Sequence, residues 1–442
     1  MRKTIPPEHI RFAHISDCHI GGWRKESLNQ LGYEAFTKAI DIIIEEELDF
    51  VIISGDLYDV SNPKVDAVDL ATAQFKRLSD NKIPVYGIMG SHDYSPSDRS
   101  MIRPLKSAGL YTDLYIPTPL KEDKLQLEFV VDPDTEIKLT GIRARKRSLE
   151  IKDYEKLEKL ALEKEPGRKI FVLHTMIEEL KPKIHAMMKA GPQSLLPRGF
   201  LYYAGGHLHM THPTELRIRD SITIQKDDPL PERIVYPGCL FPTRFNELEE
   251  FKVGGFCICD LDTNSEDLTV TFTPLQIKEI EKITIQADNK SIQQLKTGLE
   301  QELKRREIDD KIVIIRIEGE LASGKSYELR PAELIADLKK KGAYEVLINK
   351  AKLRSHQTTK IEDDDLDTIE EIETRYIYKH SQNIEIEGIK AEDLEQKIHT
   401  IISELGQGLQ SGQKKKDYKA AMINSFYKIM NISLKTSEEH ED

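Results

Sequence analysis

The sequence predicts a layered α/β domain that is followed by a smaller α/β unit and a helical tail. Short apolar runs alternate with helix-like stretches up to about residue 275, a second and shorter alternation follows, and two amphipathic stretches lie beyond an acidic segment. The 442 residues exceed the usual length of one domain about threefold, which favours several units. We predict boundaries at 1–278 for the large domain, 279–355 for the small unit, 356–388 for an acidic linker, 389–434 for a helical region and 435–442 for the last residues.

The strands of the large domain are predicted from short runs of β-branched and aromatic residues, most of which end at a glycine or a charge. These runs are Ile10–Ser16, Phe50–Ser54, Pro84–Met89, Ile170–Leu173, Leu201–Ala204 and Ile234–Tyr236. Between them, Ser27–Leu48 and Val65–Asp80 carry apolar residues at helical spacing. This alternation predicts sheets that are covered by helices.

The small unit reads as βαβαβ between Lys282 and Leu353. Its strands contain ITIQA, KIVIIRIEG and YEVLINKA, and its helices cover Ser291–Glu307 and begin again at Pro331. The segment Gly319–Ser326 matches the phosphate-loop pattern G-x-x-x-x-G-K-S. A phosphate loop needs a helix that begins at its Lys-Ser pair, whereas the helix signal is delayed here to Pro331. We therefore expect a turn and not a nucleotide site.

The tail begins with an acidic stretch, because eight of the twelve residues of Glu362–Glu373 are acidic, which is typical of a solvated linker. Ala391–Leu409 and Lys415–Ile432 are predicted to be helices, each with one apolar stripe. Such stripes need a cover, which is either the parent domain or a partner. The residues that we predict to contact a partner are Ile398, Ile402, Phe426 and Met430.

Composition and charge exclude several classes of protein. The first residues contain prolines and Glu8 where a signal peptide needs an unbroken apolar stretch, and no apolar run approaches the roughly 18 residues of a membrane-spanning helix. These features predict a cytoplasmic protein without membrane contact. Four cysteines, none in a C-x-x-C pair, are predicted to be reduced and structural. The net charge of −12 argues against a globally basic nucleic-acid binder, so any such contact is expected on one face.

Polar residues follow five of the predicted strands, at the edge where α/β sheets place their ligand sites. They are Asp17 and His19, Asp56, His92 and Asp93, His174, and His207 and His209. The spacing in D-x-H and H-x-H puts both side chains of a pair on one face of an extended chain. Asp and His clusters suit manganese, iron or zinc, and two ions about 3.5–4 Å apart can activate water for attack at phosphorus. We therefore predict a two-metal phosphoesterase and not five unrelated polar strand ends.

The order D-x-H, G-D, G-x-H-D, H and G-H-x-H resembles the calcineurin-like metallophosphoesterase superfamily. The segments DCHIGG, SGDLYD, IMGSHD, LHT, GGHLH and YPGC, with the small unit and the tail, resemble the nuclease family of the double-strand-break repair complex that is related to bacterial SbcD. The resemblance covers nearly the whole chain. It implies a layered α-β-β-α nuclease domain, a capping domain at 279–355 and a tail that binds an SMC-like coiled-coil ATPase. It also implies a homodimer with two Mn²⁺ per subunit, which acts on DNA at the nucleoid as a 3′-to-5′ duplex exonuclease and a single-strand endonuclease.

The resemblance further implies roles for single residues. The first metal would be held by Asp17, His19, Asp56 and His209, and the second by Asp56, His174 and His207. The family has Asn before its catalytic histidine, but this chain has Ser91, whose shorter hydroxyl is a poorer ligand. His92 would protonate the leaving sugar oxygen, Asp93 would orient the imidazole of His92, and Asp59 would have a supporting role.

Two further sets of residues carry predictions. A basic cluster in GIRARKRS would attract a DNA backbone through counterion release, although a solvated strand end is the alternative. Its members are Arg143, Arg145, Lys146 and Arg147. Helices over Val65–Asp80 and Ser100–Ala108 would lie at a two-fold interface by resemblance, through Val68, Ile102 and Leu105, and packing on the sheet is the alternative.

Two other functions compete with the nuclease. A phosphomonoesterase or cyclic-nucleotide phosphodiesterase of the same superfamily would share the motifs but would have no obvious need for the small unit and the tail. A non-catalytic scaffold would show a decayed metal site, of which Ser91 would be the trace. The six other ligand residues argue against such decay.

Overall fold

The computed structural model describes residues 8–95, 100–119, 123–182, 189–355, 377, 381, 391–406 and 415–430. The chain divides into two compact units, Met1–Ser355 and His356–Asp442, and each is described by itself. In the part of the chain that is described, no helix has the length and apolar character needed to cross a membrane.

The first sheet of the large domain has seven strands and holds the N-terminal motif. In sheet order they are β11 (Ile222–Ile224), β14 (Leu268–Leu275), β13 (Gly254–Asp262), β1 (His9–Ile15), β2 (Phe50–Ile53), β3 (Val85–Gly87) and β4 (Thr112–Asp113). The strands from β1 to β4 are parallel neighbours, and β13 pairs antiparallel with β1 and β14. All four residues of β2 are buried, as its apolar FVII sequence predicts for a central strand.

The second sheet has five strands, and all its neighbours are parallel except β7 and β8. In sheet order they are β12 (Ile234–Val235), β10 (Tyr202–Gly206), β9 (Lys169–His174), β8 (Lys138–Ile142) and β7 (Val130–Val131). A separate pair is formed by β5 (Pro117–Pro119) and β6 (Leu125–Leu127).

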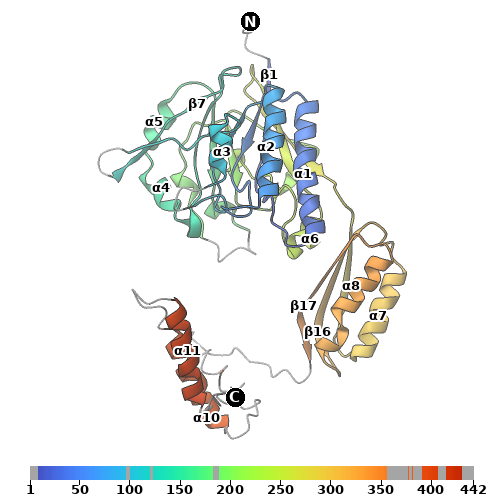
Figure 1. Ribbon diagram of the computed structural model, residues 1–442. Helices are drawn as coiled ribbons and strands as arrows, with labels where there is room; N and C mark the ends of the chain where they lie inside the picture. Colours follow the sequence, from blue (N-terminus) through green and yellow to red (C-terminus); the bar gives the residue numbers. More distant parts are fainter. Residues whose placement is uncertain are drawn as a thin grey trace, which may run out of the picture. The chain divides into compact units, whose positions relative to one another are not determined.

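The two sheets face each other across one apolar core. Phe12 and Phe50 of the first sheet lie in the same buried cluster as Val172 and Tyr202 of the second sheet. On the outer face of the first sheet, α1 (Glu26–Glu45) and α2 (Val65–Asp80) run side by side and bury their apolar stripes (Figure 1). The short helices α4 (Ile151–Lys156) and α5 (Lys159–Lys164) contribute to the cluster beyond the second sheet. These layers confirm the predicted α-β-β-α fold.

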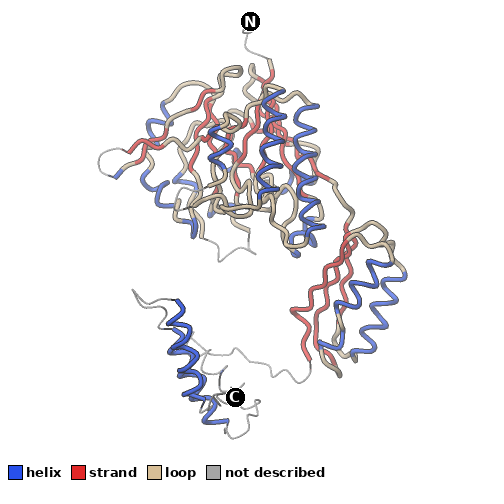
Figure 2. The backbone as a smooth tube through the Cα atoms, viewed as in Figure 1, coloured by secondary structure: helices blue, strands red, loops and turns tan. Residues whose placement is uncertain are grey.

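The small unit has the predicted βαβαβ order, with three parallel strands drawn in red and two helices in blue (Figure 2). Its elements are β15 (Ile280–Gln286), α7 (Ile292–Lys304), β16 (Ile312–Leu321), α8 (Pro331–Lys340) and β17 (Glu345–Ser355). The helix α7 begins with a capping box in which Ser291 and Gln294 satisfy each other's backbone N–H groups. Residues 279–355 fall in the same compact unit as the large domain, so the boundary near 278 stays a prediction.

The segment that matches a phosphate loop does not form one. Gly319–Leu321 belongs to β16 and pairs with Leu353–Ser355 of β17, so the first residues of the pattern are in a sheet and not in a loop. A single turn of 3-10 helix covers Ser326–Leu329, and α8 begins only at Pro331. No α-helix therefore starts at the Lys-Ser pair, as the sequence predicts.

The apolar residues that were predicted at a two-fold interface are largely used inside the chain. Ile102 and Leu105 of α3 (Ile102–Ser107) are only 3% and 1% exposed and belong to the core cluster of the first sheet. Val68 is partly buried against the same cluster. Ile102 and Leu105 thus pack on the sheet and offer almost no surface to a second copy, which corrects their assignment. A homodimer stays a prediction that would need other residues.

In the second unit, α10 (Ala391–Gly406) and α11 (Lys415–Met430) form a helical pair, and Lys397 of α10 donates to the carbonyl of Ile429. Of the predicted partner-binding residues, Ile402 and Phe426 are exposed, Ile398 is half-buried and Met430 is buried. The acidic stretch Glu362–Glu373 lies outside the described residues.

Candidate metal centre

The candidate ligands meet where the carboxyl ends of the two sheets come together. The loops after β1, β2 and β3 bring Asp17, His19, Asp56 and His92, and β9 and the loop after β10 bring His174 and His209. Three groups drawn from these residues have ligand atoms that all lie within 4.8 Å of one another: Asp17, His19 and His209; Asp17, Asp56 and His174; and His19, Asp56 and His92. A fourth group joins His209 to Cys239 and Glu247. Asp17 and Asp56 each belong to two groups, so the chain offers two adjoining sites that share carboxylates.

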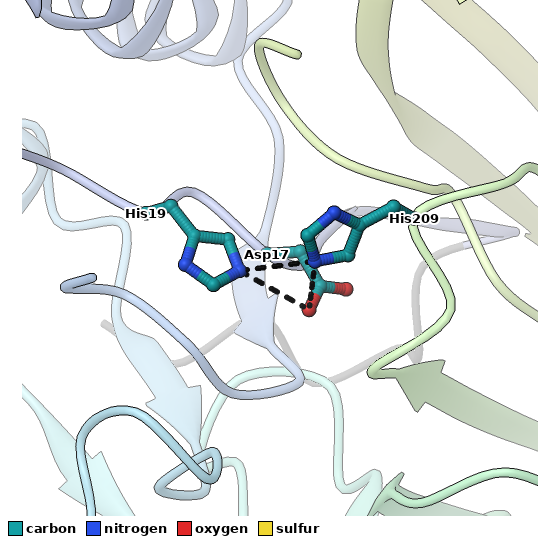
Figure 3. A group of neighbouring side chains, drawn as sticks. All are labelled: Asp17, His19 and His209. Carbon is teal, nitrogen blue, oxygen red and sulfur yellow. Dashed lines mark hydrogen bonds and ion pairs between the residues drawn. The ribbon is translucent and has the colours of Figure 1, made fainter. Parts of the chain in front are cut away.

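The first group forms a triangle of ligand atoms (Figure 3). The Nε2 atoms of His19 and His209 are 3.1 Å apart, and they lie 3.9 and 3.7 Å from Oδ1 of Asp17. Asp17 is fully buried and His19 is 4% exposed. Two imidazole nitrogens and a carboxylate oxygen that face a common point are a suitable donor set for a divalent transition metal.

Both imidazoles of this group are oriented by a carboxylate on their other nitrogen. Nδ1 of His19 lies 3.0 Å from Oδ1 of Asp59, and Nδ1 of His209 lies 2.8 Å from Oε1 of Glu247. A carboxylate accepts, so each Nδ1 carries a proton, and a ring that gives up its proton at Nε2 presents the lone pair of that atom to the common point. Asp59 thus supports the site by orienting the ring of His19, and it also lies near His92.

The second group centres on Asp56. Nε2 of His174 lies 3.1 Å from Oδ2 of Asp56, yet this fully buried nitrogen makes no hydrogen bond, and Nδ1 of His174 donates to the carbonyl oxygen of Ser54 at 2.7 Å. Oδ2 of Asp56 is also 3.7 Å from Nε2 of His19. A buried nitrogen that faces a carboxylate without hydrogen-bond geometry fits a cation between them. Asp56 is placed to bridge two such cations.

The backbone at these positions is left-handed, which the extended geometry assumed for D-x-H and H-x-H did not anticipate. Asp17, His19, Asp56 and His207 have φ values of 49°, 44°, 51° and 90°. Non-glycine residues seldom adopt this region, and each such residue costs about 1–3 kcal/mol unless its surroundings hold it. Asp17 and His19 still converge, but by a turn of the loop and not by strand alternation. Backbone strain at these four candidate ligands supports a functional role for the loops.

Two glycines of the motifs are needed because ligand side chains pack directly on them. A Cβ atom on Gly90 would lie 2.1 Å from Oδ1 of Asp56, and one on Gly55 would lie 2.3 Å from Nδ1 of His174. Real Cβ atoms do not approach so closely, so G-D and G-x-H-D owe their glycines to the close approach of backbone and ligands.

The buried charges of the site stabilise one another. Burial alone would raise the pKa of Asp56, but the charge of the neighbouring His174 holds that pKa far below its usual value. Burial alone would lower the pKa of His19, but the hydrogen bond to Asp59 and the neighbouring carboxylates raise it to about 8. Burial alone would also lower the pKa of His174, but the neighbouring carboxylate of Asp56 raises it to about 10. Without a metal, these imidazoles therefore serve as the cations of the site.

His92 lies at the rim of the centre. Its side chain is 38% exposed, its Nδ1 donates to the carbonyl oxygen of Asp59 at 2.6 Å, and its backbone N–H donates to Oδ1 of Asp56 at 2.7 Å. Because Nδ1 is engaged, Nε2 is the atom of the ring that is available to a substrate or to a cation.

Asp93 does not orient the imidazole of His92, which corrects that prediction. Its carboxylate is 1% exposed and accepts from the backbone N–H groups of Leu57, Tyr58 and Gly90 at 2.9–3.1 Å. Burial, followed by the charge of Asp56, raises its pKa to about 6. Asp93 therefore joins the loop after β2 to the loop after β3 and holds the backbone that carries Asp56 and His92.

Two predicted ligands stand outside the three groups. The ring of His207 packs edge-on against that of His174 with 5.3 Å between centroids, and its backbone N–H donates to the carboxylate of Asp17. Burial, and then the charge of His174, lowers the pKa of His207 to about 4, so its ring is neutral and keeps a lone pair for a cation. Ser91 is half-buried in the loop between Gly90 and His92. The ligand roles of both residues stay predictions.

Glu247 is a site residue that the sequence does not reveal. It lies on α6 (Phe245–Phe251), 38 positions from His209, and its other oxygen accepts from the backbone N–H of Thr243 at 2.9 Å. The sequence NELEE offers several acidic residues and no feature that distinguishes the one that turns inward.

The basic segment lies beside the loop of His92. The backbone N–H of Ala144 donates to the carbonyl oxygen of Met89 at 2.9 Å, and the guanidinium of Arg143 lies over the rings of Tyr94 and Tyr115 at 5.5 and 4.8 Å. Nε of Arg145 is 3.2 Å from Asp153. The two cations that remain exposed are Lys146 and Arg147.

Comparisons with known proteins agree with this geometry. Residues 10–211 match the calcineurin-like phosphoesterase family. Curated relatives described as DNA double-strand break repair protein Mre11 are 31% identical over 204 residues in Methanococcus maripaludis and in Saccharolobus solfataricus, covering 45% of this chain and 52% and 49% of those proteins. The Sulfolobus acidocaldarius protein of the same description is 29% identical over 314 residues, covering 70% of this chain and 75% of its own length.

The chain thus spans about half the length of the first two of these relatives. A solved dimetal phosphatase from Danio rerio matches 60% of this chain and 99% of its own at a TM-score of 0.35 and 12% identity, a likeness too weak to support a conclusion. The family match covers the β1, β2, β3, β9 and β10 motifs that supply the clustered ligands. The chain therefore contains a domain, residues 10–211, that matches the calcineurin-like phosphoesterase family.

Proposed function

We propose that this protein is a metal-dependent DNA nuclease that processes DNA ends in double-strand-break repair. The observation that carries the proposal is the pair of adjoining ligand groups around Asp17 and Asp56, with His92 half-exposed at their rim. The similarity to proteins described as Mre11 supports DNA as the substrate. The proposed activities are 3′-to-5′ exonuclease action on duplex ends and endonuclease action on single strands.

The donor atoms fit two Mn²⁺ ions. Asp17, His19, Asp56 and His209 would hold the first, and Asp56, His174 and His207 would hold the second, with Ser91 or a water in the remaining position. When bound, two divalent cations lower the pKa of water and neutralise charge on a phosphodiester. Asp59 and Glu247 contribute by holding the rings of His19 and His209 in the tautomer that presents Nε2.

His92 is the residue that we assign to the leaving group. A sugar oxygen that leaves as an alkoxide needs a proton, and histidine can supply one near neutral pH. The carbonyl of Asp59 engages Nδ1, so the proton would come from Nε2, on the side of the ring that is open to substrate. The exposed Lys146 and Arg147 would contact the DNA backbone beside this loop, where their charge offsets the overall acidity of the chain.

The tail and the small unit would serve the assembly. We propose that 279–355 is a capping domain that shapes access of DNA and that α10 and α11 bind the coiled coil of an SMC-like ATPase. Exposed Ile402 and Phe426 support this docking surface, whereas Met430 is already buried. A homodimer bound to DNA in the cytoplasm is the proposed working form.

The test is a cleavage assay with labelled duplex and single-stranded DNA, in Mn²⁺ and in Mg²⁺, beside p-nitrophenyl phosphates as rival substrates. We expect Mn²⁺-dependent cleavage of DNA, and we expect His92→Asn to abolish it without loss of bound Mn²⁺. Preference for the small phosphate esters would favour a phosphomonoesterase. Failure of the purified protein to bind Mn²⁺ would favour a scaffold. Loss of Mn²⁺ in His92→Asn would make His92 a ligand, as its place beside His19 and Asp56 also permits.

Ser91→Asn tests the proposed second metal. The amide oxygen of Asn reaches one bond further than the serine hydroxyl, so we expect a lower Mn²⁺ concentration at half-maximal activity. An unchanged Mn²⁺ titration would show that Ser91, or a water on it, already completes the site.

A further inference from the structure

The short helix α6 contacts both the metal centre and the small α/β unit. Glu247 approaches His209 with 2.8 Å between Oε1 and Nδ1, and its side chain is 12% exposed. Glu249, two positions later, pairs with Arg316 of β16 and with Lys282 of β15. Residues two apart on a helix point about 200° away from each other. One turn of helix thus directs one carboxylate to a candidate ligand and another to the small unit.

The contact between α6 and the small unit is close and largely shielded from water. Nε of Arg316 lies 2.8 Å from both oxygens of Glu249, another of its nitrogens donates to Oδ1 of Asn246 at 2.9 Å, and its guanidinium lies over the ring of Phe245 at 5.3 Å. The side chains of Arg316 and Glu249 are 16% and 10% exposed. A paired guanidinium and carboxylate in such a place define geometry, because neither group has water as an alternative partner.

The inner side of α6 is equally constrained. Leu248 is fully buried in the core of the first sheet, and Glu247 also accepts from the N–H and hydroxyl of Thr243. A rotation or shift of α6 that follows Arg316 would therefore move the carboxylate that orients His209. The connection from Arg316 to His209 consists of two ion pairs and a single helical turn, without a flexible loop between them.

We propose that α6 couples the small α/β unit to the metal centre, with Glu247 as the positioning residue of His209 and the Glu249–Arg316 pair as the contact that sets its place. This inference rests on the proposed metal site and deepens it, because it makes the affinity for Mn²⁺ depend on how residues 279–355 dock on the large domain. Any partner or DNA that displaces this unit would change metal affinity at a distance.

The test measures Mn²⁺ binding to the full chain from the electron paramagnetic resonance signal of free Mn²⁺, with thermal unfolding of the metal-free protein as a check on folding. Glu247→Ala should weaken Mn²⁺ binding about 10- to 100-fold, the usual effect of losing a partner of a metal ligand. Arg316→Gln should weaken it about two- to thirtyfold although Arg316 does not touch a ligand. Arg316→Lys keeps a cation beside Glu249 but loses the paired hydrogen bonds and the contact with Phe245, so it should restore only part of the affinity.

The matched control is Lys25→Gln. Lys25 joins the large domain to the small unit through Glu345 at 2.9 Å and the carbonyl oxygen of Val346, and not through α6, so its loss should leave Mn²⁺ affinity unchanged. In the Glu247→Ala background, Arg316→Gln should cause no further loss, because both changes act through the same carboxylate.

Unchanged Mn²⁺ affinity in folded Arg316→Gln, equal loss in Lys25→Gln, or additive losses in the double variant would each overturn the coupling through α6. If Arg316→Gln does not fold, Asn246→Ala, which removes an acceptor of Arg316, provides the same measurement with a smaller change. A wild-type chain that binds no Mn²⁺ would overturn the proposed function together with this inference. A wild type that binds Mn²⁺ and cleaves DNA, with a flat Arg316 series, would overturn the inference alone.

Discussion

The metal edge, where the two sheets bring the candidate ligands together, differs from the small α/β unit in backbone conformation and in what it buries. At the metal edge, Asp17, His19, Asp56 and His207 have left-handed backbones, and carboxylates and imidazoles are buried together. In the small unit, the non-glycine residues with positive φ are Asn289, Asp310 and Arg330, all in connections between elements, and its core is aliphatic. Backbone strain and buried charge thus coincide where chemistry is proposed, whereas in the small unit the positive-φ residues lie in connections and outside the aliphatic core.

The largest effect is expected at the carboxylate that both ligand groups share. Asp56→Ala should weaken Mn²⁺ binding more than about 100-fold, since losing even an outer partner of a ligand costs 10- to 100-fold. The metal-free protein should also lose about 3–5 kcal/mol of stability, because buried His174 would keep a charge without its partner. Calorimetric Mn²⁺ titration and thermal unfolding measure both. Near-normal Mn²⁺ affinity in Asp56→Ala would remove Asp56 as the shared ligand.

One substitution made in both regions should have opposite signs. Gly90→Ala places a Cβ atom 2.1 Å from Oδ1 and 2.2 Å from the backbone nitrogen of Asp56, so we expect destabilisation by about 1–3 kcal/mol and weaker Mn²⁺ binding. Gly298→Ala lies within α7 with no atom within 4 Å of the new Cβ, so it should stabilise the protein by about 0.5–1 kcal/mol.

Chemical denaturation of the two variants provides the comparison. Equal effects of Gly90→Ala and Gly298→Ala would show that the metal edge is no more tightly constrained than an ordinary helix.

The sequence predicts the metal edge through its motifs, because each candidate ligand lies next to a recognisable strand end. It also predicts the order of strands and helices, since β2 and the strands of the small unit have strong apolar patterns. The left-handed turns at Asp17 and His19 are not predicted, because a spacing of two is equally compatible with an extended chain. Burial of Ile102 and Leu105 is not predicted either, because the same apolar stripe serves a core or an interface.

The partners of the ligands are the least predictable part of the site. Asp93 is adjacent to His92 in sequence, yet its carboxylate turns to the backbone of Leu57 and Tyr58, which are 36 and 35 positions away. Glu247 reaches His209 only because α6 packs on the first sheet through Leu248. Both contacts depend on tertiary packing, for which a single sequence carries no local signal.

A rise in pH should have opposite effects on metal affinity and on the stability of the metal-free protein. His19 and His174, with pKa values raised to about 8 and about 10, must release protons to bind a metal, so Mn²⁺ affinity should rise with pH by about tenfold per unit for each proton displaced. A group whose pKa is raised in the folded state contributes its full stabilisation below the unfolded pKa near 6.5. This stabilisation is lost as pH rises through the folded pKa. Metal-free stability from these groups should therefore fall from pH 6.5 to 9, through His19 up to about pH 8 and through His174 over the whole interval.

The two trends are measured by Mn²⁺ titration and thermal unfolding at pH 6.5, 7.5 and 9. Mn²⁺ affinity that is independent of pH would contradict protonated imidazoles in the metal-free site.

The smallest effect is expected at the start of α7, in the region without strain. The hydroxyl of Ser291 accepts from the N–H of Gln294, and the side-chain oxygen of Gln294 accepts from the N–H of Ser291, so Ser291→Ala leaves the N–H of Gln294 to water. The expected loss is about 1 kcal/mol in the free energy of unfolding, with no change in Mn²⁺ affinity. Ser291→Asp, which keeps an acceptor at the cap, is the matched control and should retain most of the stability. A shift in Mn²⁺ affinity in Ser291→Ala would mean that the whole small unit, and not the contact of Arg316 with α6, influences the metal centre.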